Sequence, residues 1–137
     1  MFSGQRVDNT GQTLPNSVFL DCVSLSSVEL HDKIRFIYWK AFYGCSSLTS
    51  ITIPTDIVYI DENCFQDCLI LKEVIIHNSL VANSLSLNNS HGYLINYAET
   101  VYIKTGLSTE SSTYLIKNFT KQATSDKVGY DMYLVNA

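Results

Sequence analysis

The sequence lacks the features that mark several large classes of protein. Charged residues make up only 16% of its 137 residues, and the nine Lys and Arg side chains form no cluster. We therefore expect no nucleic-acid partner, because binding to a phosphate backbone draws on clustered basic side chains. No apolar run approaches the roughly 18 residues that are needed to cross a bilayer. Membrane insertion is therefore not expected either.

A secretory signal is also missing from the start of the chain. Residues 1–16, MFSGQRVDNTGQTLPN, contain one basic residue and no apolar segment of the kind that a signal peptide requires. Two interpretations stay open at this point. The protein is either cytoplasmic, or the chain is a fragment of something longer.

Catalytic motifs are absent from the sequence as well. It contains no G-x-S-x-G elbow, no H-E-x-x-H pair and no glycine loop that could cradle a phosphate. His91 lies in a polar segment and has no Ser or Cys partner by spacing. The sequence therefore predicts a protein that is not an enzyme, without catalytic residues and without a cofactor.

What the sequence does contain is an internal repeat of 23 residues, which is the mark of a stacked architecture. Eight apolar columns recur through three copies. The columns are Leu14, Ile37 and Ile60; Val18, Ala41 and Cys64; Phe19, Phe42 and Phe65; Cys22, Cys45 and Cys68; Leu25, Leu48 and Leu71; Val28, Ile51 and Val74; Leu30, Ile53 and Ile76; and Ile34, Ile57 and Leu80.

Each copy contains two kinds of local pattern. The segments LSSVEL, LTSITI and LKEVII alternate at their ends with the period of two that is typical of a strand with one buried face. Such strands stack into a parallel ladder with neighbours about 4.8 Å apart. The small residue, Phe and Cys of each copy follow at helical spacing, with Pro15 and Asp61 as start signals. One coil is therefore predicted to be a strand, a turn, an extended segment and a short helical turn.

The repeat divides the chain into segments of one predicted domain, 1–137. Residues 1–13 are a polar N-terminal lead-in, and 14–80 hold three repeats. A degenerate fourth repeat spans 81–103, and 104–137 form a C-terminal cap of one helix and one strand.

The fourth repeat regains its register only when four extra residues are allowed. Leu87 then joins the Leu14 column, while Ile95, Ala98, Val101 and Ile103 fill the Cys, Leu and strand columns. The cap is predicted from SSTYLIKNF, which favours a helix of three turns, and from VGYDMYLV, which alternates loosely like a closing strand.

The segment AFYGCSSLTSITIP, residues 41–54, closely resembles the repeat of BspA-type leucine-rich-repeat proteins. Their signature is A-F-x-x-C-x-x-L-x-x-I-x-[IL]-P, followed by an I-x-x-I segment that Ile57 and Ile60 match. The third copy departs at Cys64 and His77, and the first at Val18 and His31. The resemblance covers residues 14–80 well and 81–103 weakly.

This resemblance implies a fold and a class of function. The fold is an α/β solenoid, a leucine-rich-repeat-like right-handed superhelix of 23-residue coils with a C-terminal cap. The family is described mainly as surface antigens, so the resemblance implies a cell-surface or secreted protein that adheres to a host or matrix protein. These functions come by analogy, because a fold does not fix a function.

The strand face is the predicted binding surface. If the aligned aliphatic residues point inward, the alternate residues of each strand point outward, where solenoids commonly bind their ligands. The predicted outward residues are Ser27, Glu29, Ser50, Thr52, Glu73 and Ile75. Ile75 is the one apolar residue among them.

Cysteine and histidine columns suggest two further sites. Cys22, Cys45 and Cys68 could form a disulfide or bind a metal, or they could be a ladder of buried thiols, and the latter is favoured because free Cys is often buried. His31 and His77 lie two coils apart near Glu29 and Glu73, either as metal ligands or, as favoured here, as solvated edge residues. No metal site is therefore predicted.

A structural role is the alternative to a binding module. The polar lead-in leaves the first coil without cover, so units could assemble end to end through that coil. The alternative therefore predicts self-association that a charge at Val18 or Leu25 would abolish.

Overall fold

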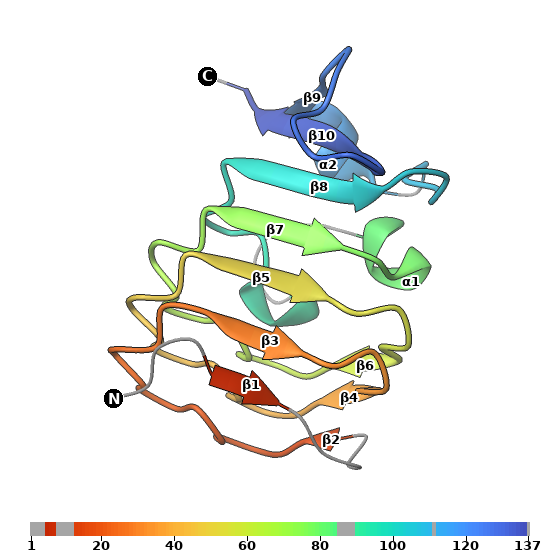
Figure 1. The fold of residues 1–137 in the computed structure, drawn as a ribbon. Helices are drawn as coiled ribbons and strands as arrows, with labels where there is room; N and C mark the ends of the chain where they lie inside the picture. The colour runs from red at the N-terminus through yellow and green to blue at the C-terminus, as the bar shows by residue number, and fades with distance from the viewer. Residues whose placement is uncertain (1–4, 8–12, 85–89, 111, 137) are drawn as a thin grey trace.

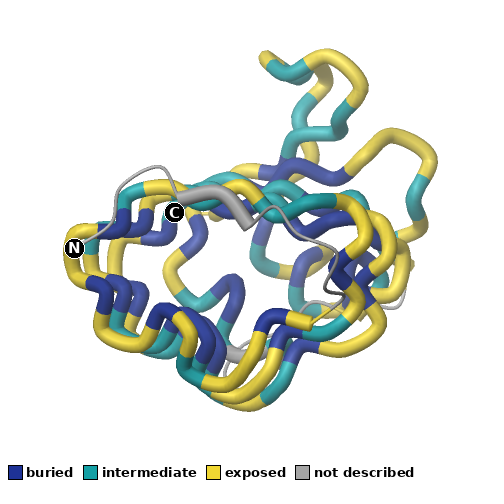
Figure 2. The backbone as a smooth tube through the Cα atoms, turned by 60° about the horizontal axis from the view of Figure 1, so that its bottom comes forward, coloured by how far each residue is buried: buried dark blue, intermediate teal, exposed yellow. Residues whose placement is uncertain are grey.

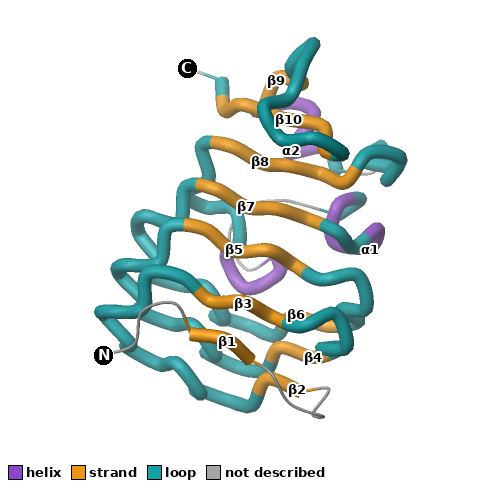
Figure 3. Tube along the Cα trace, in the orientation of Figure 1, coloured by secondary structure: helices purple, strands orange, loops and turns teal. Residues whose placement is uncertain are grey.

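A computed structural model describes residues 5–7, 13–84, 90–110 and 112–136 of the chain. The backbone winds into a solenoid whose coils stack on one another (Figure 1). Each coil adds one strand to a ladder on one side, and the first three coils add a shorter strand on the opposite side (Figure 3). The stacked coils that the repeat predicts are thus present.

Five parallel strands line one side of the stack in chain order, with the first two paired in one sheet and the last three paired in another. They are β1 (Gln5–Val7), β3 (Val28–Leu30), β5 (Ser50–Ile53), β7 (Glu73–Ile76) and β8 (Thr100–Lys104). β5 pairs with β7 in the register of the 23-residue repeat. β7 pairs with β8 so that Glu73 lies beside Thr100, 27 positions later in the chain. The four extra residues predicted for the fourth coil are therefore confirmed by its strand register.

A second ladder lies on the other side of the first three coils. It consists of β2 (Thr13–Leu14), β4 (Phe36–Ile37) and β6 (Tyr59–Ile60), all parallel. Leu14, Ile37 and Ile60 occupy equivalent positions in it and are buried. The core therefore lies between the two ladders, closed at its sides by the turns of each coil.

Seen along the stack, the buried positions line the inside of the coils and the exposed positions line the outside (Figure 2). Six of the eight predicted columns are buried or partly buried in all three copies. In the fourth coil, Ile95, Ala98, Val101 and Ile103 are buried as predicted. Leu87, which the register places with Leu14, lies outside the described residues.

The two remaining columns each contain an exception. Val18 is 41% exposed, whereas its equivalents Ala41 and Cys64 are fully buried. Leu80 is 64% exposed, although Ile34 and Ile57 in its column are buried. The first exception arises because Val18 lies in the terminal coil, and the second because the chain changes course after β7.

The change of course is made by α1 (Ser79–Ala82), a single helical turn. Asn78 precedes it as a buried N-cap whose Oδ1 accepts from the N–H of Val81 at 3.1 Å. Its Nδ2 donates to the carbonyls of Thr55 and Ile57 in the preceding coil, at 2.8 and 2.7 Å. The helical turn directs Val81 inward and leaves Leu80 in solvent, so the predicted core role of Leu80 is wrong.

The short helical turn predicted for each repeat is also wrong. Residues 38–45 form successive turns in which the N–H of Cys45 bonds to the carbonyl of Phe42, three residues back. Lys40 and Gly44 have positive φ angles of 55° and 74°, which a right-handed helix does not allow. The N–H of Phe42 instead bonds to the carbonyl of Cys64 in the next coil at 2.8 Å. These hydrogen bonds therefore join the coils, so the repeats form a β-solenoid.

The C-terminal residues contain α2 (Thr113–Asn118), β9 (Phe119–Lys121) and β10 (Tyr130–Val135). β10 runs antiparallel to β8 and carries β9 on its far edge. A helix and a strand are thus present where the sequence predicts them, although the helix spans six residues and Phe119 begins a strand.

The N-terminal end differs from its prediction. β1 pairs with β3, so that a strand lies beside the first predicted repeat on the strand side. The opposite side of that coil, which carries Val18, remains uncovered by any described residue. Among the described residues, the uncovered end thus comprises the turns of the first coil and the outer edge of β2.

Candidate binding surface on the strand face

The side chains of the strand face are set by the alternation of inward and outward residues along β5 and β7. Ile51 and Ile53 point inward and are buried, and Val74 and Ile76 continue these two columns in the next coil. The residues between them point away from the core. The structure places all six predicted residues on this outer face, with Ser27 and Glu29 exposed and Ser50, Thr52, Glu73 and Ile75 partly exposed.

Strand pairing brings these outward residues into rows across the coils. Thr52 lies beside Ile75, Ile75 beside Tyr102, and Tyr102 opposite Met132. Ile75 is thus the centre of a row that is polar at one end and apolar at the other. Ile75 is the partly exposed aliphatic member of this row, between Thr52 and Tyr102.

The upper part of this row is covered by the segment that joins β9 to β10. The hydroxyl of Tyr102 donates to Oδ1 of Asp126 at 2.5 Å, and Nζ of Lys127 lies 5.1 Å from the centroid of the Tyr102 ring. Tyr102 is therefore only 5% exposed although it points outward. The sequence did not predict this contact, because no periodic relation links 102 to 126.

The same contact changes the acidity of the phenol. The hydrogen bond to Asp126 raises the pKa of Tyr102 to about 12, with burial and the charges of Asp126 and Glu73 acting in the same direction. Tyr102 is thus a protonated donor throughout the physiological range, and its bond holds the β9–β10 segment over the strand face.

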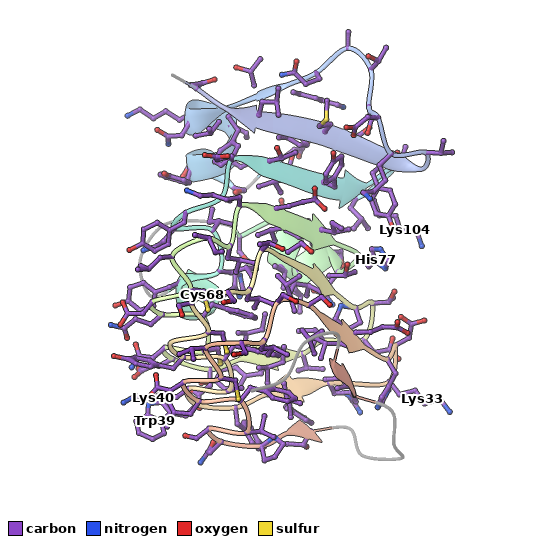
Figure 4. All side chains as sticks on the ribbon, turned by 60° about the vertical axis from the view of Figure 1, so that its left-hand side comes forward. Lys33, Trp39, Lys40, Cys68, His77 and Lys104 are labelled. Carbon is purple, nitrogen blue, oxygen red and sulfur yellow. The ribbon has the colours of Figure 1, made fainter. Side chains whose placement is uncertain are left out.

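His77 lies at the C-terminal edge of the same face, close to Lys104 (Figure 4). Its Nε2 contacts the hydroxyl of Tyr130, and the two rings lie 5.4 Å apart. Burial lowers the pKa of His77, the charge of Lys104 lowers it further, and Asp32 opposes both. The neutral imidazole therefore links β7 to β10.

His31 and His77 do not come together in the structure. Nδ1 of His31 accepts from the N–H of Lys33 at 3.2 Å, whereas His77 contacts Tyr130. Within the described ranges, no three His, Cys, Asp or Glu side chains are grouped so that they could hold a metal ion. The geometry therefore gives no support to the metal-ligand interpretation of this pair.

The four cysteines are buried free thiols. Sγ of Cys45 donates to the carbonyl of Phe19, and Sγ of Cys68 donates to that of Phe42, both at 3.1 Å. Burial raises the pKa values of Cys45, Cys64 and Cys68 to about 12. The buried-thiol interpretation is thus confirmed, and each of these sulfurs joins its coil to the preceding one.

His91 has a partner that the sequence did not predict. Its Nε2 lies 2.8 Å from Oγ of Ser84, at an open hollow lined by Ser79, Leu80, Asn83, Ser84 and Ser108. Oγ of Ser84 also donates its proton to the carbonyl of Leu80 at 2.6 Å, so it can only accept a hydrogen bond from His91. His91 then acts as the donor. The pair thus joins the end of α1 to the 3-10 helix η1 (Ser90–Tyr93).

The model of the BspA-type leucine-rich-repeat region matches residues 5–125 in six copies. The chain belongs to the BspA-type leucine-rich-repeat family. Repeats of this family are typically non-enzymatic scaffolds that mediate protein interactions. Among the described helices, none is long and apolar enough to cross a membrane.

One solved structure resembles this BspA-type chain, a leucine-rich repeat protein from Bacteroides ovatus. The sequences are 30% identical over 52% of this chain, and the TM-score is 0.39. This chain covers only 24% of that protein. No curated protein matches the chain.

Proposed function

We propose that this BspA-type chain is a non-catalytic binding module that holds a protein partner against its strand face. The observation that carries the proposal is the outward position of Ile75, a partly exposed aliphatic residue that lies between Thr52 and the covered ring of Tyr102. A solenoid presents such a row as a continuous surface, because each coil adds one outward position per column. Thr52 and Ile75 are two of the six outward residues predicted from the sequence.

Family resemblance supports a partner of the adhesin type, namely a host or matrix protein, and a location at the cell surface or outside the cell. A cytoplasmic location is the alternative. Brief protease treatment of intact producing cells tests the location, because only a surface protein would be cleaved while a cytoplasmic marker survives.

The binding surface is tested with purified protein on immobilised matrix and serum proteins. We expect Ile75→Glu and Thr52→Arg to weaken binding at least about tenfold, because each places a charge inside the desolvated contact. Ile116→Glu is the matched control, since Ile116 is 58% exposed on α2. Equal loss for the control and the two face variants, or no loss for either face variant, would refute the strand-face proposal.

End-to-end assembly through the first coil is the second candidate, and the exposure of Val18 favours it. In the turns that carry the Phe column, the backbone hydrogen bonds between coils run in one direction, from an N–H of one coil to a carbonyl of the coil that follows it in the chain. The N–H of Phe19 donates to the carbonyl of Ala41, and the N–H of Phe42 donates to the carbonyl of Cys64. The equivalent carbonyl of Val18 accepts from no described residue. A further coil could therefore add here through both apolar and hydrogen-bonding contacts.

Light scattering over a range of concentrations tests this candidate. Val18→Glu should abolish any oligomer, whereas Val128→Glu, at a residue that is 98% exposed elsewhere, should not. Leu25 is unsuitable for this test, because it is fully buried and a charge there would unfold the coil. A monomer at all concentrations would dismiss end-to-end assembly.

A further inference from the structure

A second surface, distinct from the strand face, lies on the other side of the coils. It carries five partly exposed aromatic side chains, here called the aromatic patch. They are Phe36, Tyr38, Trp39, Tyr43 and Tyr59. The most exposed of them are Tyr38 at 37%, Trp39 at 42% and Tyr59 at 49%. Large exposed aromatic groups are costly to solvate and mark interaction sites when they cluster.

The second ladder holds the patch together. Phe36 of β4 lies beside Tyr59 of β6, and both point outward because the next residues, Ile37 and Ile60, are buried. The rings of Phe36 and Tyr38 lie 6.0 Å apart at an angle of 30°. Phe36, Tyr38 and Tyr59 are therefore neighbouring aromatic groups, whereas Trp39 and Tyr43 are linked through Lys40.

The protein already places its own cations on these rings. Nζ of Lys40 lies 4.5 Å from the ring centroid of Trp39 and 4.8 Å from that of Tyr43 (Figure 4 labels Trp39 and Lys40). The guanidinium of Arg35 lies 5.9 Å from the ring of Phe36. These contacts show that the rings present their negative faces to cations at the distances that stabilise them.

Carboxylates surround the patch at positions set by the repeat. Asp61 and Glu62 follow β6, one coil above Tyr38 and Trp39, and the N–H of Lys40 bonds to the carbonyl of Glu62. Oδ1 of Asp61 accepts from the hydroxyl of Tyr59 at 3.0 Å.

Two more carboxylates stand near Tyr43 from the coils on either side. Asp67 first, and Asp21 to a lesser degree, raise the pKa of the Tyr43 phenol through their negative charges. Both carboxylates are exposed. The four acidic residues around the patch therefore outnumber its two cations, Arg35 and Lys40.

We propose that the aromatic patch binds a basic polypeptide segment, with an Arg or Lys side chain stacked on Tyr38 or Tyr59 and its charge facing Asp61 and Glu62. Charge complementarity selects this partner, because an exposed ring flanked by carboxylates attracts a cation through both the ring quadrupole and the net charge. Arg fits best, since its planar guanidinium stacks on a ring while its edge donates to a carboxylate.

Intrinsic fluorescence tests the proposal directly, because Trp39 is the only tryptophan in the chain. The probe is a synthetic octapeptide of alternating Arg and Gly, and the control probe replaces each Arg with Glu. We expect a saturable change in Trp39 emission with the Arg peptide that weakens as salt rises, and none with the Glu peptide.

Three substitutions locate the site within the patch. Tyr59→Ala and Asp61→Asn should each weaken binding of the Arg peptide about 2- to 5-fold, which is the effect of losing one exposed cation–π or charge contact. Lys40→Gln should tighten binding of the Arg peptide about 2-fold, because one of the two positive charges at the patch is removed. Ile75→Glu should leave the affinity unchanged, which separates this surface from the strand face.

Two results would overturn the proposal. One is that both Tyr59→Ala and Asp61→Asn bind the Arg peptide with the same affinity as the parent protein. The other is the absence of any response to the Arg peptide, whether or not a neutral oligosaccharide such as maltopentaose changes Trp39 emission. Circular dichroism of each variant verifies that the coils remain folded.

Discussion

The rings of Phe42 and Phe65 lie almost parallel, with centroids 5.2 Å apart and planes inclined by 8°. Phe19 stacks on the other face of Phe42 at 5.4 Å and 19°. This spacing is close to the separation of neighbouring strands, about 4.8 Å, because each ring belongs to the coil next along the stack. The three side chains thus form one aromatic column through the interior.

Phe42→Ala should reduce the free energy of unfolding by about 3–5 kcal/mol, the usual effect of removing a buried Phe ring. Phe42 is fully buried and loses contacts with a ring on each side, whereas Phe19, at 7% exposure in the terminal coil, loses only one. Equilibrium denaturation measures both variants. A loss below about 1 kcal/mol for Phe42→Ala, or a larger loss for Phe19→Ala, would contradict the stacked column.

Gly44→Ala should destabilise the protein by about 1–3 kcal/mol, as a non-Gly residue at a left-handed position does when a neighbour must also move. The φ angle of Gly44 is +74°, and an added Cβ would lie 2.1 Å from Oδ1 of Asp21. Gly106 is the matched control, since its φ is +99° but nothing lies within 4 Å of an added Cβ. The same melting temperature for both Ala variants would show that Asp21 moves away without cost.

The buried thiols should resist alkylation in the folded protein. The thiolate is the reactive form, and burial raises the pKa of Cys68 to about 12, so little thiolate exists at pH 8. Reaction with an aromatic disulfide reagent should therefore follow unfolding, with Cys22 the first to react because it lies in the terminal coil and is 6% exposed. Complete reaction of all four thiols within seconds, without denaturant, would contradict this burial.

Asp126→Asn should lower the pKa of Tyr102 from about 12 towards its ordinary value near 10, because the charged acceptor is lost. The folded pKa lies above the unfolded one, so the contribution of this bond to stability is complete below pH 10 and disappears as the pH rises through about 12. A difference titration of phenolate absorbance, using Tyr102→Phe as the reference, isolates this one phenol. An unchanged pKa in Asp126→Asn would show that Asp126 is not the partner.

Much of the fold could be predicted because the repeat specifies which residues meet. The register of β5 and β7 and the four-residue shift of β8 follow from aligning the columns, since each column must share one interior. The predicted helical turns failed for a physical reason. A spacing of three and four residues suits a helix, but it equally suits successive turns. The left-handed conformation of Lys40 has no signal in residue type, because Lys does not favour positive φ angles.

The candidate surfaces were predictable to different degrees. The outward position of Ile75 follows from alternation alone, because neighbouring strand residues point in opposite directions. The contact of Tyr102 with Asp126 and that of Ser84 with His91 join segments without a common period. Only the path of the chain between β8 and β10, and around α1, brings those pairs together.

The sequence by itself determined which side chains form the interior and in what order the coils stack, because identical spacing lets equivalent apolar groups pack on one another. The tertiary structure alone decided which outer positions are covered and which are open. It buried Tyr102 under Lys127, exposed Leu80, and brought His91 to Ser84. Such contacts depend on turn geometry and on hydrogen bonds between coils, and hydrophobic periodicity contains no information about either.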